Sequence, residues 1–422
     1  MSSHGQKSRR KAGAGSSARM AGVSETAPAW PQCPWPSLVL VVLFVTACAT
    51  PEQPRHGTMP GDGQRPRGEV VARSISATPA LDLSALSNLE GIIPELAEKR
   101  VVFVGESHNR YDHHLTQLEI IRGLHAIQPR LAIGMEMFQQ PFQRYLDAYV
   151  AGKLSEAELL RSTEYYRRWR FDFRLYAPIL RYAREHQLPV VALNLPVELT
   201  RKVGGKGIDG LTQAERAAIP EAIDRSDTLY VQRLKEIFDQ HPHKQGQSFE
   251  HFLEVQLLWD EGMAERAAAY LKSHPDHAMV VLAGSGHLAH GSGIPRRLLR
   301  RVPVSSAIVL NSWEGGLEPG LADFLLLPQR RVLPAAGKLG ALLAEQDGKL
   351  KVDTCISGSP CEAAGIRQGD QVFAVNGRPV VTMADLREVT WDKKPGDKVT
   401  LEIRRKRWFA QPQELSYELE LR

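Results

Sequence analysis

The chain has 422 residues, of which 43% are hydrophobic and 24% are charged, so it is long enough for two domains with buried cores. The net charge is only +5, and several of the basic residues precede the first apolar run: Lys7, Arg9, Arg10, Lys11 and Arg19. This balance gives no indication of a nucleic-acid-binding surface, and we predict no nucleic-acid partner.

The first apolar run covers Leu38 to Ala47. It is shorter than the roughly 20 residues that a membrane-spanning helix needs. Basic residues before it and small residues after it are typical of a signal peptide, and Val45-Thr46-Ala47-Cys48 resembles a lipobox. We therefore predict a signal peptide over residues 1–48, ending at a lipidated Cys48. The lipid would anchor the chain on the periplasmic face of the bacterial cell envelope, and Ala49 favours the outer membrane.

Residues 49–80 are predicted to form a flexible tether, because Thr50 to Gly68 is rich in Pro, Gly and Arg. Beyond the tether the chain holds two cysteines, Cys355 and Cys361, six residues apart. An oxidising periplasm would allow them to form a disulfide, and the alternative is a pair of small buried thiols.

Residues 81–328 alternate short apolar runs with longer stretches of helical period. The predicted strands are Val101–Val104, Leu131–Gly134, Val190–Leu193, Met279–Ala283 and Ala307–Leu310. The predicted helices are His113–Ile127, Pro141–Ala151, Ser155–Tyr165, Leu175–His186, Asp224–Phe238 and Phe249–Leu271. Such alternation predicts an α/β domain with a mostly parallel sheet covered by helices. The strand-free segment from Pro196 to Phe249 predicts a helical insertion.

Residues 332–422 predict a second, small β-rich domain. Its predicted strands are Lys351–Cys355, Gln371–Val375, Lys398–Ile403 and Leu415–Leu421, with one helix over Met383–Val389. Turn signals separate them, notably Asn376-Gly377 and Pro395-Gly396-Asp397.

Polar residues follow the predicted strands of the first domain. Glu106 and His108 follow the first strand, Glu136 the second, Asn194 the third, and His287 the fourth. The carboxyl ends of parallel strands meet at one edge of the sheet, where ligands bind, so these residues should converge. One such Glu or His alone is more often structural, but two of each at corresponding positions indicate a functional site.

The chemistry of this predicted site remains open between two readings. Glu106, His108, Glu136 and His287 could hold a divalent metal such as Zn²⁺ or Mn²⁺. Alternatively, one imidazole held by a carboxylate could act as a general base on water. His113 and Gln117 share a helix face, so one of them could point toward the same crevice; solvated imidazoles at a helix start are the alternative.

The first domain resembles the ChaN-like haem-binding lipoprotein family, within a larger Tiki/TraB and erythromycin-esterase-like grouping. The residues that carry the resemblance are Gly105-Glu106-Ser107-His108, Asp112-His113-His114, Gln117, Gly134-Met135-Glu136-Met137-Phe138, Leu146-Asp147, Trp169, Tyr176, Pro178, Asn194-Leu195-Pro196, Gln256, Trp259-Asp260, Met263-Ala264, Ala283-Gly284-Ser285-Gly286-His287 and Gly293-Ile294-Pro295. The sequence departs from the family at Asn109-Arg110-Tyr111.

This resemblance implies haem binding linked to iron uptake, with a tyrosine as axial ligand and a possible homodimer around stacked haems. The candidate cofactor-binding residues are Glu106, His108, His113, Glu136, Asn194, Gly286 and His287. The candidate axial tyrosines are Tyr145, Tyr149, Tyr165, Tyr166 and Tyr176. Four arginines interleaved with aromatic residues would suit haem propionates: Arg167, Arg168, Arg170 and Arg174. In esterase-like and Tiki-like relatives the matching Glu and His residues hydrolyse substrates instead.

The second domain resembles a PDZ domain of the type that accompanies bacterial proteases. The residues that carry the resemblance are Lys338-Leu339-Gly340-Ala341, Ser359-Pro360-Cys361-Glu362-Ala363-Ala364-Gly365-Ile366, Gly369-Asp370-Gln371-Val372 and Asn376-Gly377-Arg378-Pro379-Val380. The resemblance implies that Leu339, Gly340 and Ala341 bind the C-terminal carboxylate of a protein or an extended peptide, which adds a strand to the sheet.

The sequence thus favours an envelope lipoprotein that binds haem or a metal ion, with a PDZ domain that recruits a protein partner. A hydrolase using the Glu/His set and a non-enzymatic PDZ adaptor are the two alternatives.

Overall fold

The computed structural model describes residues 83–240, 248–313, 315–407 and 409–422. The predicted signal peptide, Cys48 and the tether lie outside the described residues. Within the described residues, no helix is both long and apolar enough to cross a membrane.

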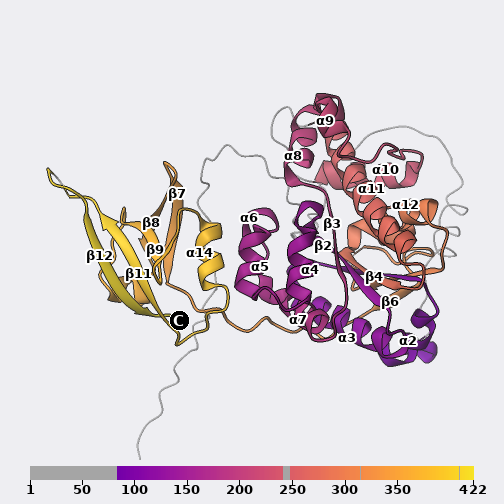
Figure 1. Ribbon diagram of the computed structural model, residues 1–422, viewed down its shortest axis with the longest axis horizontal. Helices are drawn as coiled ribbons and strands as arrows, with labels where there is room; N and C mark the ends of the chain where they lie inside the picture. Colours follow the sequence, from indigo (N-terminus) through magenta and orange to yellow (C-terminus); the bar gives the residue numbers. More distant parts are fainter. Residues whose placement is uncertain (1–82, 241–247, 314, 408) are drawn as a thin grey trace, which may run out of the picture. The chain divides into compact units, whose positions relative to one another are not determined.

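A parallel sheet forms the centre of the first domain (Figure 1). Its strands are β1 (Val101–Glu106), β2 (Leu131–Gln139), β3 (Val190–Asn194), β4 (Ala278–Gly284), β5 (Ser306–Asn311) and β6 (Phe324–Leu326). Their order is β3-β2-β4-β1-β5-β6, and every neighbouring pair runs parallel. The α/β prediction is confirmed. Strand β6 was not predicted, because three residues are too few for a periodic pattern.

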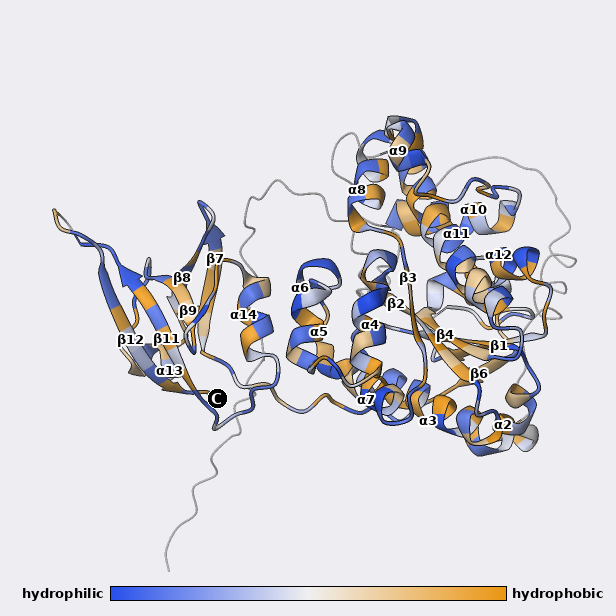
Figure 2. Cartoon of the chain, viewed as in Figure 1, coloured by the Kyte–Doolittle hydropathy of each residue, from blue (hydrophilic) through white to orange (hydrophobic). Residues whose placement is uncertain are grey.

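Helices cover both faces of this sheet, so the side chains on both faces of its central strands are buried. In β1, Val102 and Val104 belong to one apolar cluster, whereas Val101 and Phe103 belong to the other. The first cluster is completed by α2 (Leu89–Ala97), α3 (Tyr111–Ile127), α4 (Gln143–Val150), α5 (Glu156–Ser162), α6 (Tyr165–Arg168) and α7 (Ala177–Glu185). The second is completed by α11 (Phe249–Ser273) and α12 (Ile294–Arg301). In Figure 2 the strands are mainly apolar, whereas the helices show both polar and apolar residues.

One predicted helix is divided in the structure. The sequence predicted a single helix over Ser155–Tyr165, but α5 ends at Ser162 and α6 begins at Tyr165. Glu164 between them adopts a left-handed backbone conformation with φ of 50°. A residue in that conformation cannot continue a right-handed helix, so the chain turns there.

The predicted helical insertion is present between β3 and α11. It contains α8 (Val197–Lys206), α9 (Gln213–Arg216) and α10 (Thr228–Gln240). Apolar side chains of α8 and α10, such as Val203 and Leu234, form two separate clusters with interleaved residues of the first half of α11. The insertion therefore rests on the helix that covers one face of the sheet.

The second domain is an antiparallel sheet with two helices. Its elements are β7 (Ala341–Gln346), β8 (Lys349–Cys355), α13 (Pro360–Ala363), β9 (Gln371–Val375), β10 (Arg378–Pro379), α14 (Met383–Thr390), β11 (Lys398–Arg405) and β12 (Gln413–Glu420). The strand order β12-β11-β9-β8-β7 leaves β7 at an edge, and β10 pairs with β9. Asn376 and Gly377 form the predicted turn, both with positive φ. Strand β7 was not predicted, because its sequence lacks β-branched residues and clear alternation.

Candidate functional site

The carboxyl edge of the parallel sheet gathers the polar residues that the sequence placed there. Glu106 is the last residue of β1, Asn194 is the last of β3, and His287 follows the end of β4. Glu136 lies within β2, where the register with β3 shifts between Met135 and Gln139. This irregularity interrupts the ladder at Glu136, as expected where a strand edge forms a site.

Glu106 and His108 form a first carboxylate–imidazole pair. Their Oε1 and Nδ1 atoms are 2.6 Å apart, and the other oxygen of Glu106 lies 3.2 Å from Nε2 of His114. The Glu106 side chain is fully buried, whereas His108 is 21% exposed. Burial acts to lower the pKa of His108, but the charge and hydrogen bond of Glu106 outweigh it, and the pKa is raised.

The imidazoles around Glu106 lower the pKa of its carboxyl. Burial alone would raise that pKa, yet the neighbouring imidazoles of His114, His108 and His113 together reverse its effect. Glu106 is therefore an ionised carboxylate that fixes the ring of His108 through Nδ1.

His287 and Asp260 form a second pair of the same kind. Nδ1 of His287 lies 2.7 Å from Oδ1 of Asp260, and the Tyr230 hydroxyl donates to the other oxygen of Asp260 at 2.5 Å. Asp260 is fully buried, and His287 is 14% exposed. Burial acts to lower the pKa of His287, but the carboxylates of Glu136 and Asp260 raise it to about 9.

Glu136 lies between the two pairs. Its Oε1 is 3.7 Å from Nε2 of His287, and its Oε2 accepts a hydrogen bond from the backbone N–H of Gly284 at 2.7 Å. A Cβ atom on Gly284 would lie 3.1 Å from His108 and 3.7 Å from Oε2 of Glu136. Glycine at this position thus lets the backbone sit against both the first imidazole and the central carboxylate.

Two buried amides at this edge carry atoms with no hydrogen-bond partner among the described residues: Oδ1 of Asn194 and Nε2 of Gln256. The amide nitrogen of Asn194 donates to the backbone oxygen of Glu136. Gln256 precedes Asp260 by one turn of α11, so it lies on the same helix face. Unpaired buried polar atoms are costly, so these two favour a ligand with polar groups.

Aromatic rings form one wall beside the first pair. The rings of Trp169 and Phe171 lie 4.8 and 5.0 Å from the ring of His108. Trp169 also donates to the Tyr176 hydroxyl, which in turn donates to the backbone oxygen of His108. These contacts hold the loop after β1 in place.

His113 and Gln117 support that loop and are not solvated. Nδ1 of His113 accepts a hydrogen bond from the backbone N–H of Ser107, and burial and Arg110 lower the pKa of His113 to about 4. Gln117 is buried and donates to the backbone oxygen of Val104. Gly286, also predicted for the site, lies within the short 3₁₀ turn that carries His287.

The structure gives no support to the predicted divalent-metal site. Across the described part of the chain, no three His, Cys, Asp or Glu side chains are grouped so that they could hold a metal ion. Each imidazole instead uses Nδ1 to bind a buried carboxylate, on opposite sides of Glu136. Of the two carboxylates predicted as ligands, Glu106 thus orients His108, and Glu136 accepts the backbone N–H of Gly284.

Most of the candidate axial tyrosines are enclosed. Burial raises the pKa of Tyr149 to about 12 and raises the pKa values of Tyr165, Tyr166 and Tyr176 as well. An iron-binding phenolate needs the opposite shift. Tyr145 is the only one of these five tyrosines that is half-buried, and its hydroxyl accepts a hydrogen bond of 2.6 Å from Arg144.

The surroundings of Tyr145 combine an aromatic pair with guanidinium groups. Its ring stacks with that of Phe142 at 6.4 Å, and the guanidinium of Arg168 lies over Phe142. Arg168 also pairs with Glu164 and Glu198. Of the other arginines in the predicted basic stretch, Arg174 pairs with Asp172.

The predicted carboxylate-binding residues Leu339 and Gly340 directly precede β7, and Ala341 is the first residue of that strand. Gly340 has a φ of 70°, a conformation that favours glycine. The oxygens of Leu339 and Gly340 accept hydrogen bonds from Cys361 and Ile356. Their own N–H groups donate to no acceptor among the described residues, so they remain available to a carboxylate.

The sequence analysis missed two residues at the carboxyl edge of the parallel sheet. Asp260 binds Nδ1 of His287, and Tyr230 donates a hydrogen bond to Asp260. Asp260 lies in the middle of a 25-residue helix, where an acidic residue is usually solvated. The one available signal was the position of Trp259-Asp260 among the motifs shared with ChaN-like proteins.

Comparison with known protein families supports the interpretation of both domains. Residues 92–298 match the family model described as haem-binding uptake, Tiki superfamily, ChaN, and residues 337–411 match the PDZ domain model. The chain combines a ChaN-like domain with a PDZ domain.

Individual relatives are distant. The chain is 26% identical to Protein RETICULATA-RELATED 5, chloroplastic, of Arabidopsis thaliana over 51% of this chain and 31% of that protein. It is 30% identical to a probable periplasmic serine endoprotease DegP-like of Chlamydia muridarum over 31% of this chain and 24% of that protein. It thus spans less than a third of either relative. A solved structure of ChaN of Campylobacter jejuni with cofacial haem is 20% identical, with a TM-score of 0.47, over 58% of this chain and 92% of that one.

Proposed function

We propose that this protein is a lipid-anchored envelope protein that binds haem, as part of haem or iron uptake, and recruits a protein partner through its PDZ domain. The match of residues 92–298 to the haem-binding uptake family carries the proposal. The lipobox at Cys48 supports the envelope location, and the DegP-like relative is periplasmic by its name.

The residues around Tyr145 fit haem better than the crevice does. A neutral imidazole is needed to bind iron, but the raised pKa values of His108 and His287 favour imidazolium. Arg144 donates a hydrogen bond of 2.6 Å to the hydroxyl oxygen of Tyr145, and its guanidinium also lies over the Tyr145 ring, so a cation stands beside this oxygen. Tyr145 would therefore bind the iron, with Phe142 against the ring and Arg144 beside the phenolate oxygen.

A haemin titration tests this proposal. The purified protein is expected to shift the Soret band, and Tyr145→Phe should weaken binding at least tenfold, about 1.4 kcal/mol, and change the spectrum. Tyr417→Phe, a half-buried tyrosine in the PDZ domain, is the matched control. An unchanged haemin spectrum would refute haem binding, whereas normal binding by Tyr145→Phe would refute only the choice of ligand. Sedimentation with and without haemin tests the proposed homodimer.

Hydrolysis by the crevice is the second candidate, favoured by the two carboxylate–imidazole pairs that flank Glu136. Glu136 would accept a proton from water while the water oxygen bonds to a carbonyl carbon. His287, as imidazolium, would donate a proton to the leaving oxygen as its bond to that carbon breaks. Chromogenic esters offered to the wild type and to Glu136→Gln test this, with Glu158→Gln on an exposed helix start as control. Equal rates for all three proteins would exclude it.

The third candidate is an adaptor that works through the PDZ domain alone. A Cβ atom on Gly340 would lie 2.2 Å from Cβ of Ser359, so Gly340→Ala must distort the carboxylate-binding loop. An adaptor would lose its cellular function with Gly340→Ala and keep it with Glu106→Ala. A loss with Glu106→Ala would exclude the pure adaptor.

A further inference from the structure

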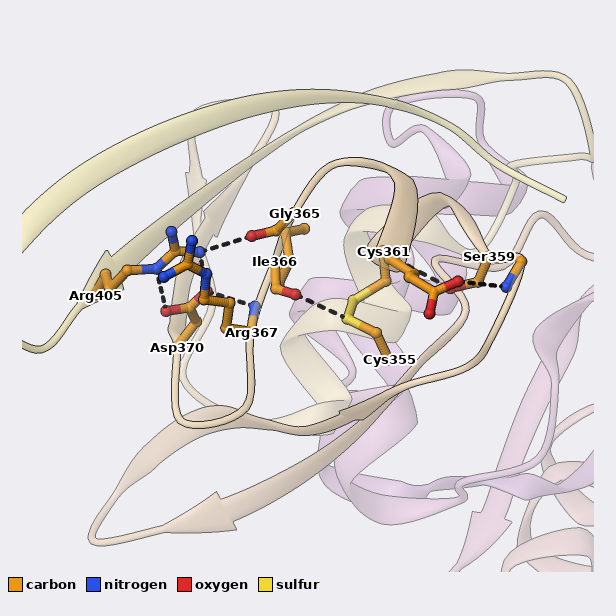
Figure 3. Close-up of a disulfide and its surroundings, with 10 residues drawn as sticks. Cys355, Ser359, Cys361, Gly365, Ile366, Arg367, Asp370 and Arg405 are labelled. Atoms are coloured by element: carbon orange, nitrogen blue, oxygen red, sulfur yellow. Dashed lines mark hydrogen bonds and ion pairs between the residues drawn. A yellow bond between two sulfur atoms is a disulfide. The ribbon is translucent and has the colours of Figure 1, made fainter.

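A disulfide lies directly under the carboxylate-binding loop of the PDZ domain. Cys355 ends β8, Cys361 lies in the first turn of α13, and the structure joins them in a disulfide (Figure 3). The bond closes the segment 355–361 into a small ring. This ring is the support on which Leu339 and Gly340 rest.

The ring and the loop are joined by direct contacts. The N–H of Ile356 donates to the oxygen of Gly340 at 2.8 Å, and the N–H of Cys361 donates to the oxygen of Leu339 at 3.1 Å. Both carbonyls of the loop are thus held from the ring side. The C=O and N–H of one trans peptide point in opposite directions, so the bond to the oxygen of Leu339 directs the N–H of Gly340 away from the ring, as carboxylate binding requires.

The packing between ring and loop is tight. No Cβ atom would fit on Gly340 without meeting Ser359 of the ring at 2.2 Å. The position of Ser359 therefore limits the conformation of Gly340. A support that moved by about an ångström would leave room for other loop conformations, at an entropic cost to any ligand that needs one of them.

The far end of α13 is anchored without the disulfide. Arg405 forms an ion pair with Asp370 at 2.7 Å and donates to the oxygen of Gly365, and Asp370 accepts the N–H of Arg367 (Figure 3). Cleavage of the disulfide would leave these contacts intact. Its effect should therefore be confined to the ring and the loop above it, with the rest of the domain folded.

The sulfurs differ in their access to a reductant. Cys361 is buried in the core of the domain at 1% exposure, whereas Cys355 is half-buried, beside the exposed Ile356. Cys355 is thus the more accessible residue of the two, and attack of a thiolate on its sulfur would release Cys361 as the leaving thiolate.

The surface around the loop indicates the kind of ligand. Leu339, Leu343 and Met383 are half-buried against the core, between the free edge of β7 and α14. Side chains of an added strand alternate, so its last and third-last residues would face this apolar floor. Leu342 and Ile356 are exposed apolar residues beside it. The partner is therefore a chain with a free C-terminal carboxylate and apolar terminal residues.

We propose that the PDZ domain holds such a C-terminus tightly only while the Cys355–Cys361 disulfide is intact, so that a dithiol reductant releases the partner. The inference rests on the proposed peptide binding. In the release step the S–S bond breaks and two thiols form. The dithiol supplies two electrons and two protons and becomes a disulfide.

Peptide binding by the full chain, with Cys33 and Cys48 changed to serine, tests the inference. The probe is a fluorescein-labelled decapeptide library ending in a free valine carboxylate, and the same library with an amidated end is the control. We expect measurable binding of the free acid, at least tenfold weaker binding of the amide, and at least a tenfold loss when dithiothreitol is added.

A second variant separates the role of the disulfide from general effects of reduction. Cys355→Ala with Cys361→Val keeps apolar side chains in the core, and it should bind as weakly as the reduced protein, with or without dithiothreitol. Circular dichroism of the reduced protein should show unchanged secondary structure. Equal affinity of oxidised and reduced protein would overturn the disulfide's role. Absence of binding in both states would overturn peptide binding itself, and with it this inference.

Discussion

At the scale of single residues, the crevice depends on carboxylates that orient imidazoles. Glu106 and Asp260 are buried and each binds Nδ1 of one histidine, and Nε2 of His287 lies 3.7 Å from Glu136. Each ring has its own buried carboxylate partner, which contributes to the raised pKa of both imidazoles.

The titration of His287 should appear in the stability of the protein. Its pKa is raised from 6.5 to about 9, so the folded state binds the proton more tightly than the unfolded state. The stability that this proton contributes is complete below pH 6.5 and is lost as the pH rises through about 9. We expect the stability difference between wild type and His287→Asn to shrink over this range.

Urea unfolding of both proteins at several pH values measures that difference. His186→Asn provides a control on a histidine outside the crevice. A difference that stays constant from pH 6 to 9.5 would contradict the proposed protonation of His287.

At the scale of elements, the α8–α10 insertion is fixed to the domain by polar contacts as well as apolar ones. Asp224, just before α10, pairs with Arg296 and Arg300 of α12. Within α10, the Tyr230 hydroxyl donates to Asp260 of α11. The insertion thus contacts Asp260, the carboxylate that orients His287. The packing of the insertion is therefore coupled to the orientation of the His287 ring.

Removal of the Tyr230 hydroxyl tests this coupling. Tyr230→Phe leaves one oxygen of the buried Asp260 without its donor, and we expect the free energy of unfolding to fall by about 1.5–3 kcal/mol. Differential scanning calorimetry would measure the loss, with Tyr417→Phe in the PDZ domain as a control. If the two variants lost the same stability, the hydroxyl of Tyr230 would have no special role.

Some elements were predictable and others were not, for physical reasons. The parallel strands were predictable because their apolar runs are buried on both faces. Strand β7 was missed because this edge strand lacks β-branched residues and a clear alternation of apolar and polar residues. The break at Glu164 was missed because helical periodicity continues across it.

At the scale of the whole molecule, the proposed lipid on Cys48 would decide where both domains work. We predict that Cys48→Ser abolishes incorporation of labelled palmitate in bacterial cells and moves the protein from the membrane fraction to the soluble fraction. Cys33→Ser should change neither result. Membrane association that persisted without Cys48 would exclude the lipid as the anchor.

The sequence by itself determined the order of domains, the α/β class and four residues of the crevice. Strand ends of a parallel sheet meet at one edge, so Glu106, His108, Glu136 and His287 could be placed together from the sequence. Cys355 and Cys361 were close enough in sequence to suggest their disulfide.

Only the tertiary structure decided what holds these groups. Asp260 and Tyr230 come from helices that are separated in sequence from the strand ends. Nothing in their local sequence indicates that Asp260 binds His287 or that Tyr230 donates to Asp260. The support of Gly340 by the ring of residues 355–361 is likewise a contact between separate segments. Such contacts follow from the packing of elements in space, which local periodicity does not determine.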